Sequence, residues 1–383
     1  MQATLEKIYV ENAQQLHQIC QSYSQAPVLA IDTEFVRTRT LYAKLGLIQI
    51  NDGKTLALID PVAITDLTPV WQLMENPNIE KVLHACSEDL EVFLTAGNCR
   101  PVNLIDSQII MAFLGHGLSM GYAAMIAHYT DIELDKSESR TDWMKRPLTE
   151  KQLKYAQADV EHLFNILPLL MADIENSGWL AAARQESELM IERKFSAIDE
   201  NQLYRNIKMA WRLSPQQLFR LQQLTIWRYQ QAKQKDRPIG FIAKDHTLLA
   251  IAQVNPSNVG IMGNIEGVEL LDVRHKGKAM LMVLKRANEQ QSPELPKQIV
   301  RLDEHPGYKQ IFKKVKHFIA QVGDDANLLV ENLASKKQIN QFLSWHFKLN
   351  DAENSPHLVD IIQGWRKPLL GDKLQAFAEN DFK

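Results

Sequence analysis

The chain has few cysteines and no long apolar segment. Cys20, Cys86 and Cys99 are the only cysteines among 383 residues, and none of them forms a CxxC pair. We therefore expect neither a disulfide framework nor a thiolate metal site. No apolar run approaches the ~18 residues of a membrane-spanning helix. The first residues include Glu6 and lack the apolar stretch of a signal peptide, so a cytoplasmic protein is expected.

An excess of positive charge is also absent. The formal net charge is −3, which as a whole-chain value does not favour a nucleic-acid binder. Lys and Arg nevertheless cluster at residues 205–244 and 309–316, whereas acidic residues collect in the first half. These basic stretches are either phosphate-facing surfaces or solvated helix faces, and composition alone leaves both interpretations open.

The first part of the chain alternates between strand and helix patterns. Short β-favouring runs occur at residues 28–31, 45–50 and 55–59, with Asn51-Asp52-Gly53 as a hairpin turn. Further elements are expected at residues 67–74 (helix), 81–84 (strand), 87–96 (helix, N-capped by Ser87) and 103–106 (strand). Antiparallel strands followed by βα alternation predict an α/β domain with a mixed sheet flanked by helices.

The remainder of the chain has a helical pattern. A long amphipathic helix is expected over residues 149–176, ended by Gly178, and strand signals fade after residue 196. Ser214, Pro215 and Gln217 then form the N-cap, N1 and capping-box positions of another helix.

Two helical segments in this part resemble each other. Residues 242–248 are echoed by residues 333–339, which is either a diverged repeat or an accident of similar helix starts. Residues 288–296 are the expected linker between the two copies. We therefore predict an α/β domain over residues 1–200 and two all-α domains over residues 207–290 and 297–383.

Two acidic residues lie at the end of the first predicted strand. Asp32 and Glu34 are spaced i, i+2, so the twofold period of a strand directs both carboxylates to one face. Oxygen-rich sites of this kind suit hard divalent cations such as Mg²⁺ and Mn²⁺, which activate water and polarise phosphates. Taken alone, the pair is equally an ordinary acidic strand end.

Three further residues extend this acidic set. Asp89 falls at the start of the helix after residues 81–84, where a carboxylate also serves simply as a partner of the helix dipole. Tyr155 and Asp159 are spaced i, i+4 on the long helix and therefore share one face. Packing of the tyrosine and solvation of the aspartate are the alternative interpretation of that pair.

The order of these motifs is more specific than any one of them. DxE on a first strand, an Asp after a later strand and YxxxD on a helix resemble the DEDD superfamily of 3′–5′ exonucleases, in its tyrosine branch. The likeness covers residues 27–170 and includes Thr33-Glu34-Phe35, residues 47–50, His84-Ala85 and Trp143. Gly364-Trp365-Arg366 and the helical half resemble the two HRDC domains of exoribonucleases in this branch. Ser107 departs from the usual pattern, in which Thr follows Asp106.

The resemblance implies a ribonuclease-H-like domain in which Asp32, Glu34, Asp89 and Asp159 bind two divalent ions, Mg or Mn. By the same analogy Asp32 bridges both ions and Tyr155 orients the attacking water. The implied reaction removes 5′-mononucleotides from the 3′ end of RNA, chiefly tRNA precursors. The sequence shows no long apolar heptad, so a monomer is expected.

Several residues are candidates for binding RNA. Phe35 is either a base-stacking platform or a core aromatic, and Arg146 is either a phosphate ligand or a solvated side chain. The helical half adds Trp211, Arg212, Arg220, Arg228, Lys233, Lys235 and Arg237. Two other functions stay open at this stage: a DNA exonuclease of the same superfamily, and a catalytically inactive RNA-binding scaffold.

Overall fold

The computed structural model describes residues 5–135, 137–290, 294–349 and 359–383. Six strands of these residues form one sheet in the order β1-β4-β3-β2-β5-β6. Their bounds are β1 Glu6–Val10, β2 Val28–Val36, β3 Lys44–Asn51, β4 Thr55–Ile59, β5 Glu80–Leu83 and β6 Leu104–Asp106. β3 pairs antiparallel with β2 and β4, and the other pairs are parallel. The predicted mixed sheet is thereby confirmed, with one unpredicted strand, β1, at its edge.

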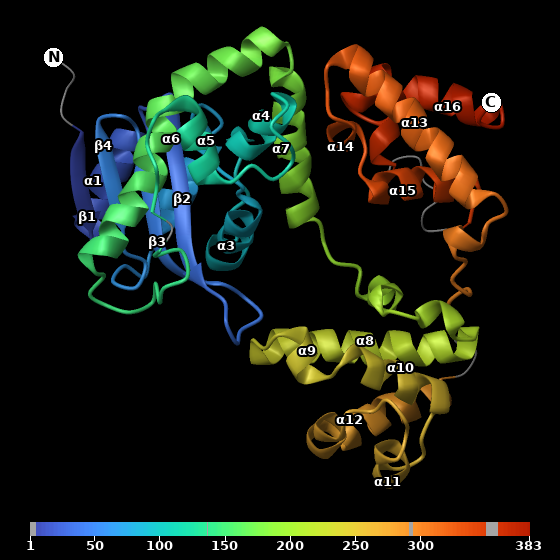
Figure 1. The fold of residues 1–383 in the computed structure, drawn as a ribbon. Helices are drawn as coiled ribbons and strands as arrows, with labels where there is room; N and C mark the ends of the chain where they lie inside the picture. Colours follow the sequence, from blue (N-terminus) through green and yellow to red (C-terminus); the bar gives the residue numbers. More distant parts are fainter. Residues whose placement is uncertain (1–4, 136, 291–293, 350–358) are drawn as a thin grey trace.

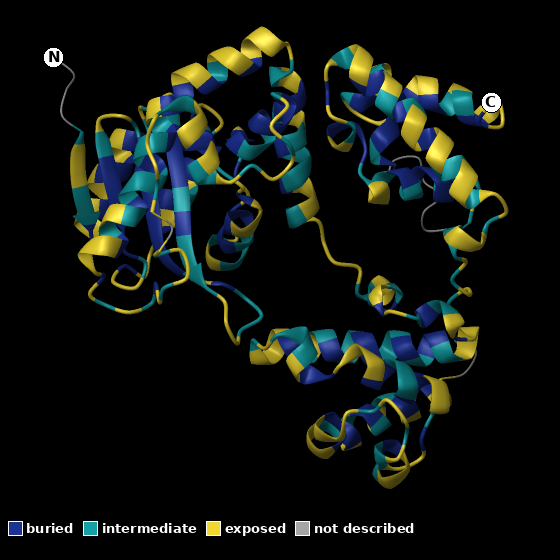
Figure 2. Ribbon diagram, viewed as in Figure 1, coloured by how far each residue is buried: buried dark blue, intermediate teal, exposed yellow. Residues whose placement is uncertain are grey.

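Helices cover both faces of the sheet (Figure 1). Their bounds are α1 Ala13–Tyr23, α2 Thr68–Met74, α3 Ser87–Gly97, α4 Ser107–Phe113, α5 Tyr122–Tyr129, α6 Glu150–Ser177 and α7 Leu180–Phe195. Along β2, Ala30 packs into the core beneath α6, whereas Leu29 and Ile31 pack into the core on the opposite face. Figure 2 shows buried residues along β2 and on the inner side of α6. The strand period therefore places Asp32 and Glu34 on the α6 face.

The ends of two helices show how well local signals predicted structure. α6 ends at Gly178, which has φ +79°, as the sequence predicted, and it begins at a capping box of Thr149 and Gln152 that the sequence analysis did not identify. Ser87, however, is not the N-cap of α3. Cys86 occupies that position without a side-chain cap bond, because the Asp106 carboxylate already fixes the turn by accepting the N–H groups of Ala85 and Cys86, each at 2.9 Å.

The rest of the chain is helical. The first group contains η1 Glu200–Asn206, η2 Ala210–Arg212, α8 Pro215–Lys235, α9 Ile239–Ile242, α10 Asp245–Val254, α11 Val259–Gly263 and α12 Leu270–Glu289. The second contains η3 Leu302–Glu304, α13 Tyr308–Ala326, α14 Val330–Leu333, α15 Lys336–His346, η6 Asp360–Ile362, η7 Lys367–Gly371 and α16 Asp372–Glu379. The first group has its own core, whereas the core of the second continues into that of the α/β domain.

The two echoed segments have the same local structure. In each, a four-residue helix (α9 or α14) ends, an extended alanine and one N-cap residue follow, and the next helix then begins. Ala243 and Ala334 have φ of −158° and −157° in these equivalent positions. This similarity favours the repeat interpretation. Of the predicted linker, residues up to 289 belong to α12 and residues 291–293 lie outside the described part.

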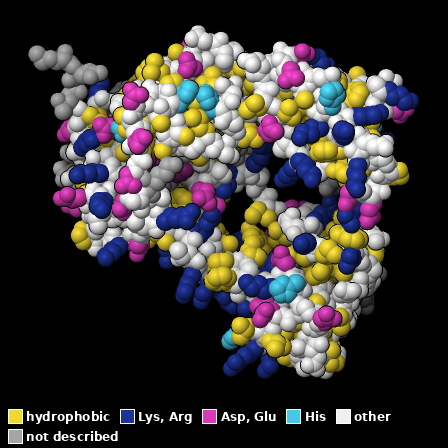
Figure 3. Space-filling view, viewed as in Figure 1, with side chains coloured by type: hydrophobic (Ala, Val, Ile, Leu, Met, Phe, Trp, Pro, Cys, Tyr) yellow, Lys and Arg dark blue, Asp and Glu magenta, His cyan; other side chains and the backbone are white. Residues whose placement is uncertain are grey.

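The three bodies are arranged around an opening (Figures 1 and 3). The second helical body joins α7 of the α/β domain, where Arg366 pairs with Glu186 and the Trp365 indole N–H donates to Glu186 at 2.9 Å. The first helical body meets the loop between β2 and β3, where Asp236 accepts the N–H groups of Leu41 and Tyr42, both at 3.0 Å. In the described part of the chain, no helix is long and apolar enough to cross a membrane.

Candidate active site

Three carboxylates from two elements meet on the α6 face of the sheet. Asp32 and Glu34 come from β2 and Asp159 from α6, and one oxygen of each lies within 4.8 Å of the others. A β-bulge falls directly after Glu34, because Glu34 pairs with Leu47 but Phe35 pairs with Leu45. Gly46, the residue skipped by this register, packs against Trp143, whose backbone oxygen would lie 2.7 Å from a Cβ there. The bulge thus shifts the register of the β2–β3 pair beside the acidic group.

Asp89 lies beside this group of three. It stands in the first turn of α3, is almost fully buried, and accepts a hydrogen bond from the Thr33 hydroxyl. Thr33 lies between Asp32 and Glu34 on β2, so the strand itself links Asp89 to the other acids. The charge of Asp89 contributes to raising the pKa of both Asp32 and Glu34.

The pKa values of the four acids are all raised. Burial is the largest cause in each case, followed for Asp32 and Glu34 by repulsion from Asp159. The pKa of Glu34 rises to about 9, that of Asp159 to about 7 and that of Asp89 to about 6. The pKa of Asp32 lies well above its ordinary value. Four ionised carboxylates this close together repel one another strongly, so bound cations are needed to keep them ionised.

A cavity of about 130 Å³ opens on these acids. It is lined by Ile31, Asp32, His84, Tyr122, Tyr155, Asp159 and Leu163, with no lysine or arginine among them. Burial, and then the charges of Asp159, Glu34 and Asp32, raise the pKa of the Tyr155 phenol. Tyr155 therefore remains a protonated hydrogen-bond donor at neutral pH. Oxygen donors, and the absence of lysine and arginine from the lining, fit this cavity to hard divalent cations.

Tyr122 is a site residue that the sequence analysis missed. Its hydroxyl lies 2.5 Å from the carbonyl oxygen of Asp159 and accepts the N–H of Leu163 at 3.1 Å. These two backbone groups are a normal i, i+4 pair of α6, so the tyrosine inserts into the helix ladder beside Asp159. Tyr122 lies on α5, and its role follows only from tertiary contact. No local sequence signal marks it.

His84 has the structural role that is usual for a histidine at a strand end. Its ring nitrogens lie 2.9 Å from the Ser107 hydroxyl and 3.1 Å from the Met120 carbonyl. The Ser107 hydroxyl also donates to the Leu83 carbonyl. Serine thus supplies the hydroxyl contacts needed at the position where the family pattern has threonine.

Two of the arginines predicted to bind RNA have partners within the protein. Arg146 pairs with Asp60 at 2.6 Å and donates to the Gly46 and Trp143 carbonyls, so its guanidinium is held by the protein. Arg228 is 7% exposed and bonded to Asp245 and the Ala243 carbonyl.

Phe35 and Arg220, the other two candidates for RNA binding, differ in what they contact. Phe35 packs against the core on the sheet face opposite the acids, which favours the core interpretation. Arg220 is partly buried and donates through Nε to the Ala252 carbonyl. Arg146 and Arg228 each pair with an aspartate, whereas no carboxylate pairs with Arg220 among the residues that the structure describes.

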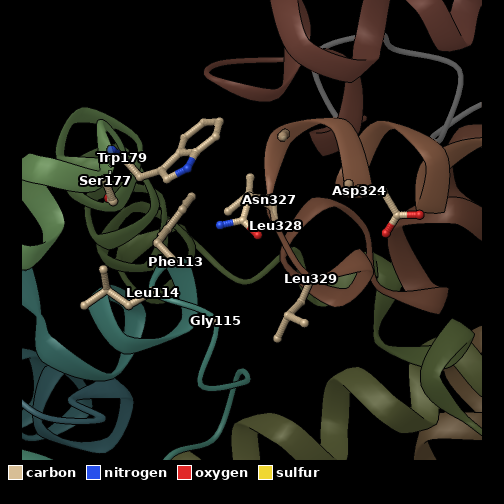
Figure 4. A pocket seen from close by; sticks show the side chains of 11 residues that line it. Phe113, Leu114, Gly115, Ser177, Trp179, Asp324, Asn327, Leu328 and Leu329 are labelled. Carbon is tan, nitrogen blue, oxygen red and sulfur yellow. Dashed lines mark hydrogen bonds between the residues drawn. The ribbon is translucent and has the colours of Figure 1, made fainter.

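A larger cavity lies elsewhere, at the junction with the second helical body (Figure 4). Its volume is about 590 Å³, and Phe113, Ser177 and Trp179 face Asn327 and Leu328 across it. None of the four acids lines this cavity. The chemistry is therefore assigned to the smaller acidic cavity.

Comparison with known proteins first defines the class. A family model described as 3′–5′ exonuclease matches residues 8–175, and an HRDC domain model matches residues 217–284. With the mixed sheet and the acidic cavity, these matches define a 3′–5′ exonuclease with helical C-terminal domains. A third model, the C-terminal HRDC domain of ribonuclease D, matches residues 306–374.

Individual relatives then give the family. The chain is 43% identical over 359 residues to ribonuclease D of Escherichia coli K12, covering 94% of this chain and 95% of that protein. It is 42% identical over 360 residues to ribonuclease D of Serratia proteamaculans, with 94% and 95% covered. The crystal structure of E. coli RNase D superposes with a TM-score of 0.93 at 40% identity, covering 98% and 99% of the two chains. The chain belongs to the ribonuclease D family, and it is a 3′–5′ exoribonuclease.

Proposed function

We propose that this enzyme trims structured RNA, chiefly tRNA precursors, from the 3′ end by phosphodiester hydrolysis that uses two divalent ions, Mg²⁺ or Mn²⁺. The observation that carries the proposal is the convergence of Asp32, Glu34 and Asp159 beside the protonated Tyr155. The solved E. coli relative is described as an exoribonuclease involved in structured RNA processing, which supports the substrate class. The enzyme would act as a monomer.

Each site residue has a distinct task in this proposal. Asp32 would hold both divalent ions, Glu34 and Asp159 would hold the ion that activates water, and Asp89, which lies beside these three acids, would support the second ion. Bound divalent ions supply the positive charge that lowers the pKa of water and stabilises the leaving 3′ oxygen. The Tyr155 hydroxyl orients the attacking water in line with the last phosphodiester bond. The product is a 5′-mononucleotide.

The arrangement of the three bodies supports a preference for 3′ tails. Lys and Arg side chains lie on the rim of the opening between the bodies (Figure 3). Phosphate contacts of this kind give sequence-independent affinity that weakens with salt. A single-stranded 3′ tail would follow this basic rim to the acidic cavity, and the folded part of the RNA would stop outside.

The proposal is tested by mononucleotide release from a 3′-tailed tRNA precursor and from DNA of matched sequence. Wild type is compared with Asp32→Asn and Tyr155→Phe, in Mg²⁺ and in EDTA. Glu175→Gln is the matched control, because Glu175 is an exposed acid on the same helix as Asp159. We expect stepwise release of 5′-mononucleotides from RNA that is lost in EDTA and in Asp32→Asn but kept in Glu175→Gln.

Two outcomes would contradict the proposal. Activity that survives both EDTA and Asp32→Asn would show that the acidic cavity is not the working site. If the DNA were degraded as fast as the RNA, the proposed preference for RNA would be wrong, and the enzyme would be a 3′–5′ exonuclease that also acts on DNA.

A further inference from the structure

Gln49 is a buried polar residue whose side chain has no hydrogen-bond partner among the residues that the structure describes. It lies on β3, is 0% exposed, and neither its Nε2 nor its Oε1 makes a hydrogen bond. A buried amide without partners costs free energy relative to an apolar side chain of similar size. Its neighbours in the chain, Ile48 and Ile50, are apolar and fully buried. The presence of an amide here therefore calls for a reason beyond packing.

The strand register places this amide next to the acidic group. Gln49 is the Cα partner of Asp32 in the antiparallel β2–β3 pair. Side chains of directly opposite residues lie on the same face, with Cβ atoms ~4.5–5.5 Å apart. Leu58 flanks Gln49 on the other side, in β4, and belongs to the core beneath α6. The amide thus stands between Asp32 and the apolar core.

The neighbouring polar residue on the same face behaves differently. Asn51 is equally buried, but its Nδ2 donates to the Val160 carbonyl of α6 at 3.1 Å and its Oδ1 accepts the N–H of Gly53 at 2.8 Å. Asn51 is therefore satisfied by the fold itself. Gln49 is the amide of this pair that the fold leaves without a hydrogen-bond partner in the described part of the chain.

We propose that Gln49 is a positioning residue for the cation site, whose Nε2–H donates to the carboxylate of Asp32 when divalent cations are bound. A carboxylate has about four lone-pair sites, so an oxygen that binds a cation still accepts a hydrogen bond. Such a contact fixes the carboxylate orientation, as partners of metal ligands commonly do. The inference rests on the proposed function, because it requires that Asp32 binds cations.

The test separates cation binding from packing by measuring both in the full-length protein. Gln49→Met keeps the size of the side chain and removes both polar atoms. Leu47→Met is the matched control, since Leu47 is a buried residue on the same strand and face. Mn²⁺ affinity is measured by isothermal titration calorimetry, and the unfolding temperature is measured in EDTA. Gln49→Leu repeats the measurement with a second apolar side chain should the Met variant fold poorly.

We expect Gln49→Met to bind Mn²⁺ ~10- to 100-fold more weakly, the usual effect of losing a partner of a metal ligand. Its unfolding temperature in EDTA should equal or exceed that of wild type, because an unsatisfied buried amide has been removed. Leu47→Met should leave the affinity unchanged. Wild-type Mn²⁺ affinity in Gln49→Met, whatever its stability, would overturn the inference and leave a packing role. Absence of Mn²⁺ binding in the wild type would instead overturn the proposed metal site itself.

Discussion

The acids of the active site make the cation-free protein sensitive to pH. The pKa of Glu34 rises to about 9 and that of Asp159 to about 7, mainly through burial. A carboxyl whose pKa is higher in the folded than in the unfolded state binds more protons when folded. Its contribution to stability is complete below the unfolded pKa of ~4 and is lost as the pH rises through the folded pKa. The cation-free protein should therefore lose stability between about pH 4 and pH 9.

Divalent cations should offset this loss. Cations bind the ionised carboxylates and compete with protons, so their stabilising effect grows with pH. We expect Mg²⁺ at a fixed concentration to raise the unfolding temperature more at pH 8 than at pH 6, as measured by calorimetry. Asp32→Asn should remove most of this Mg²⁺ effect and stabilise the cation-free protein by ~1–2 kcal/mol at pH 8, because it removes one repelling charge. An equal Mg²⁺ effect at both pH values would contradict this prediction.

Tyr155 should contribute to the reaction without holding cations. Its phenol is protonated at neutral pH and borders the cavity beside Asp159. Tyr155→Phe removes the hydroxyl, so we expect kcat to fall by ~10²-fold, the lower range for loss of a positioned proton donor or acceptor. Mn²⁺ affinity should stay within about twofold of wild type. A variant that binds Mn²⁺ much more weakly would mean that the phenol supports the cation site instead.

Single residues were predictable from the sequence to different degrees. The shared face of Asp32 and Glu34 follows from the strand period, and that of Tyr155 and Asp159 from the helix period. Their mutual approach does not follow from either period, and only the order of motifs suggested it. Tyr122 carried no signal, and Gln49 entered only as part of the family resemblance at residues 47–50, because the roles of both depend on contacts between distant elements. The same reason explains Arg228, whose charge suggested phosphate but whose partner is Asp245.

Among the elements, the end of β6 organises both neighbouring helices. Asp106 accepts the N–H groups of Ala85 and Cys86 before α3 and that of Gln108 at the start of α4. Ala85 has a positive φ of +55°, a conformation that is costly for a residue with a side chain. The aspartate thus stabilises a strained turn that directs α3, and with it Asp89, toward β2.

Removal of this carboxylate should be costly. Asp106→Ala leaves three backbone donors without their acceptor, and two of them precede a helix in the interior. We expect the free energy of unfolding to fall by ~3 kcal/mol. Each hydrogen bond to a charged group is worth ~1.5–3 kcal/mol, and water replaces part of what is lost. Urea denaturation measures this, with Glu192→Ala, an exposed acid on α7, as the control. A loss below about 1 kcal/mol would show that the turn holds without the aspartate.

At the same scale, the sequence predicted central elements better than edge elements. β2, β3 and β4 were predicted because they are apolar and joined by short connections. β1 was missed because it is a five-residue edge strand with two exposed residues, and its partner β4 lies far along the chain. Capping chemistry located the start of α8, where Ser214 and Gln217 form the predicted capping box, but misplaced that of α3, where a tertiary contact replaces the side-chain cap.

For the whole molecule, the two helical bodies are attached to the α/β domain in different ways. The second body shares a continuous core with it, and Arg366, 5% exposed, pairs with Glu186 while donating to the Leu333 carbonyl at 2.7 Å. The first body has a separate core. It contacts the α/β domain through Asp236, which accepts the N–H groups of Leu41 and Tyr42. The opening between the bodies should therefore widen first at the β2–β3 loop.

Asp236→Gly tests whether the contact between Asp236 and the β2–β3 loop keeps the opening narrow. Asp236 ends α8 with φ +46°, so glycine removes the carboxylate at a position whose backbone conformation it tolerates well. We expect the amides of Leu41 and Tyr42 to exchange with solvent at least about tenfold faster, because their acceptor is gone. Small-angle scattering should show a larger radius of gyration, while Mn²⁺ affinity should not change, since none of the four acids contacts Asp236.

Asp236→Asn retains an acceptor oxygen and serves as the control. Wild-type exchange rates in Asp236→Gly would show that packing between the loop and α9, where Leu41 and Ile239 line a shared cavity, is enough to keep the molecule closed.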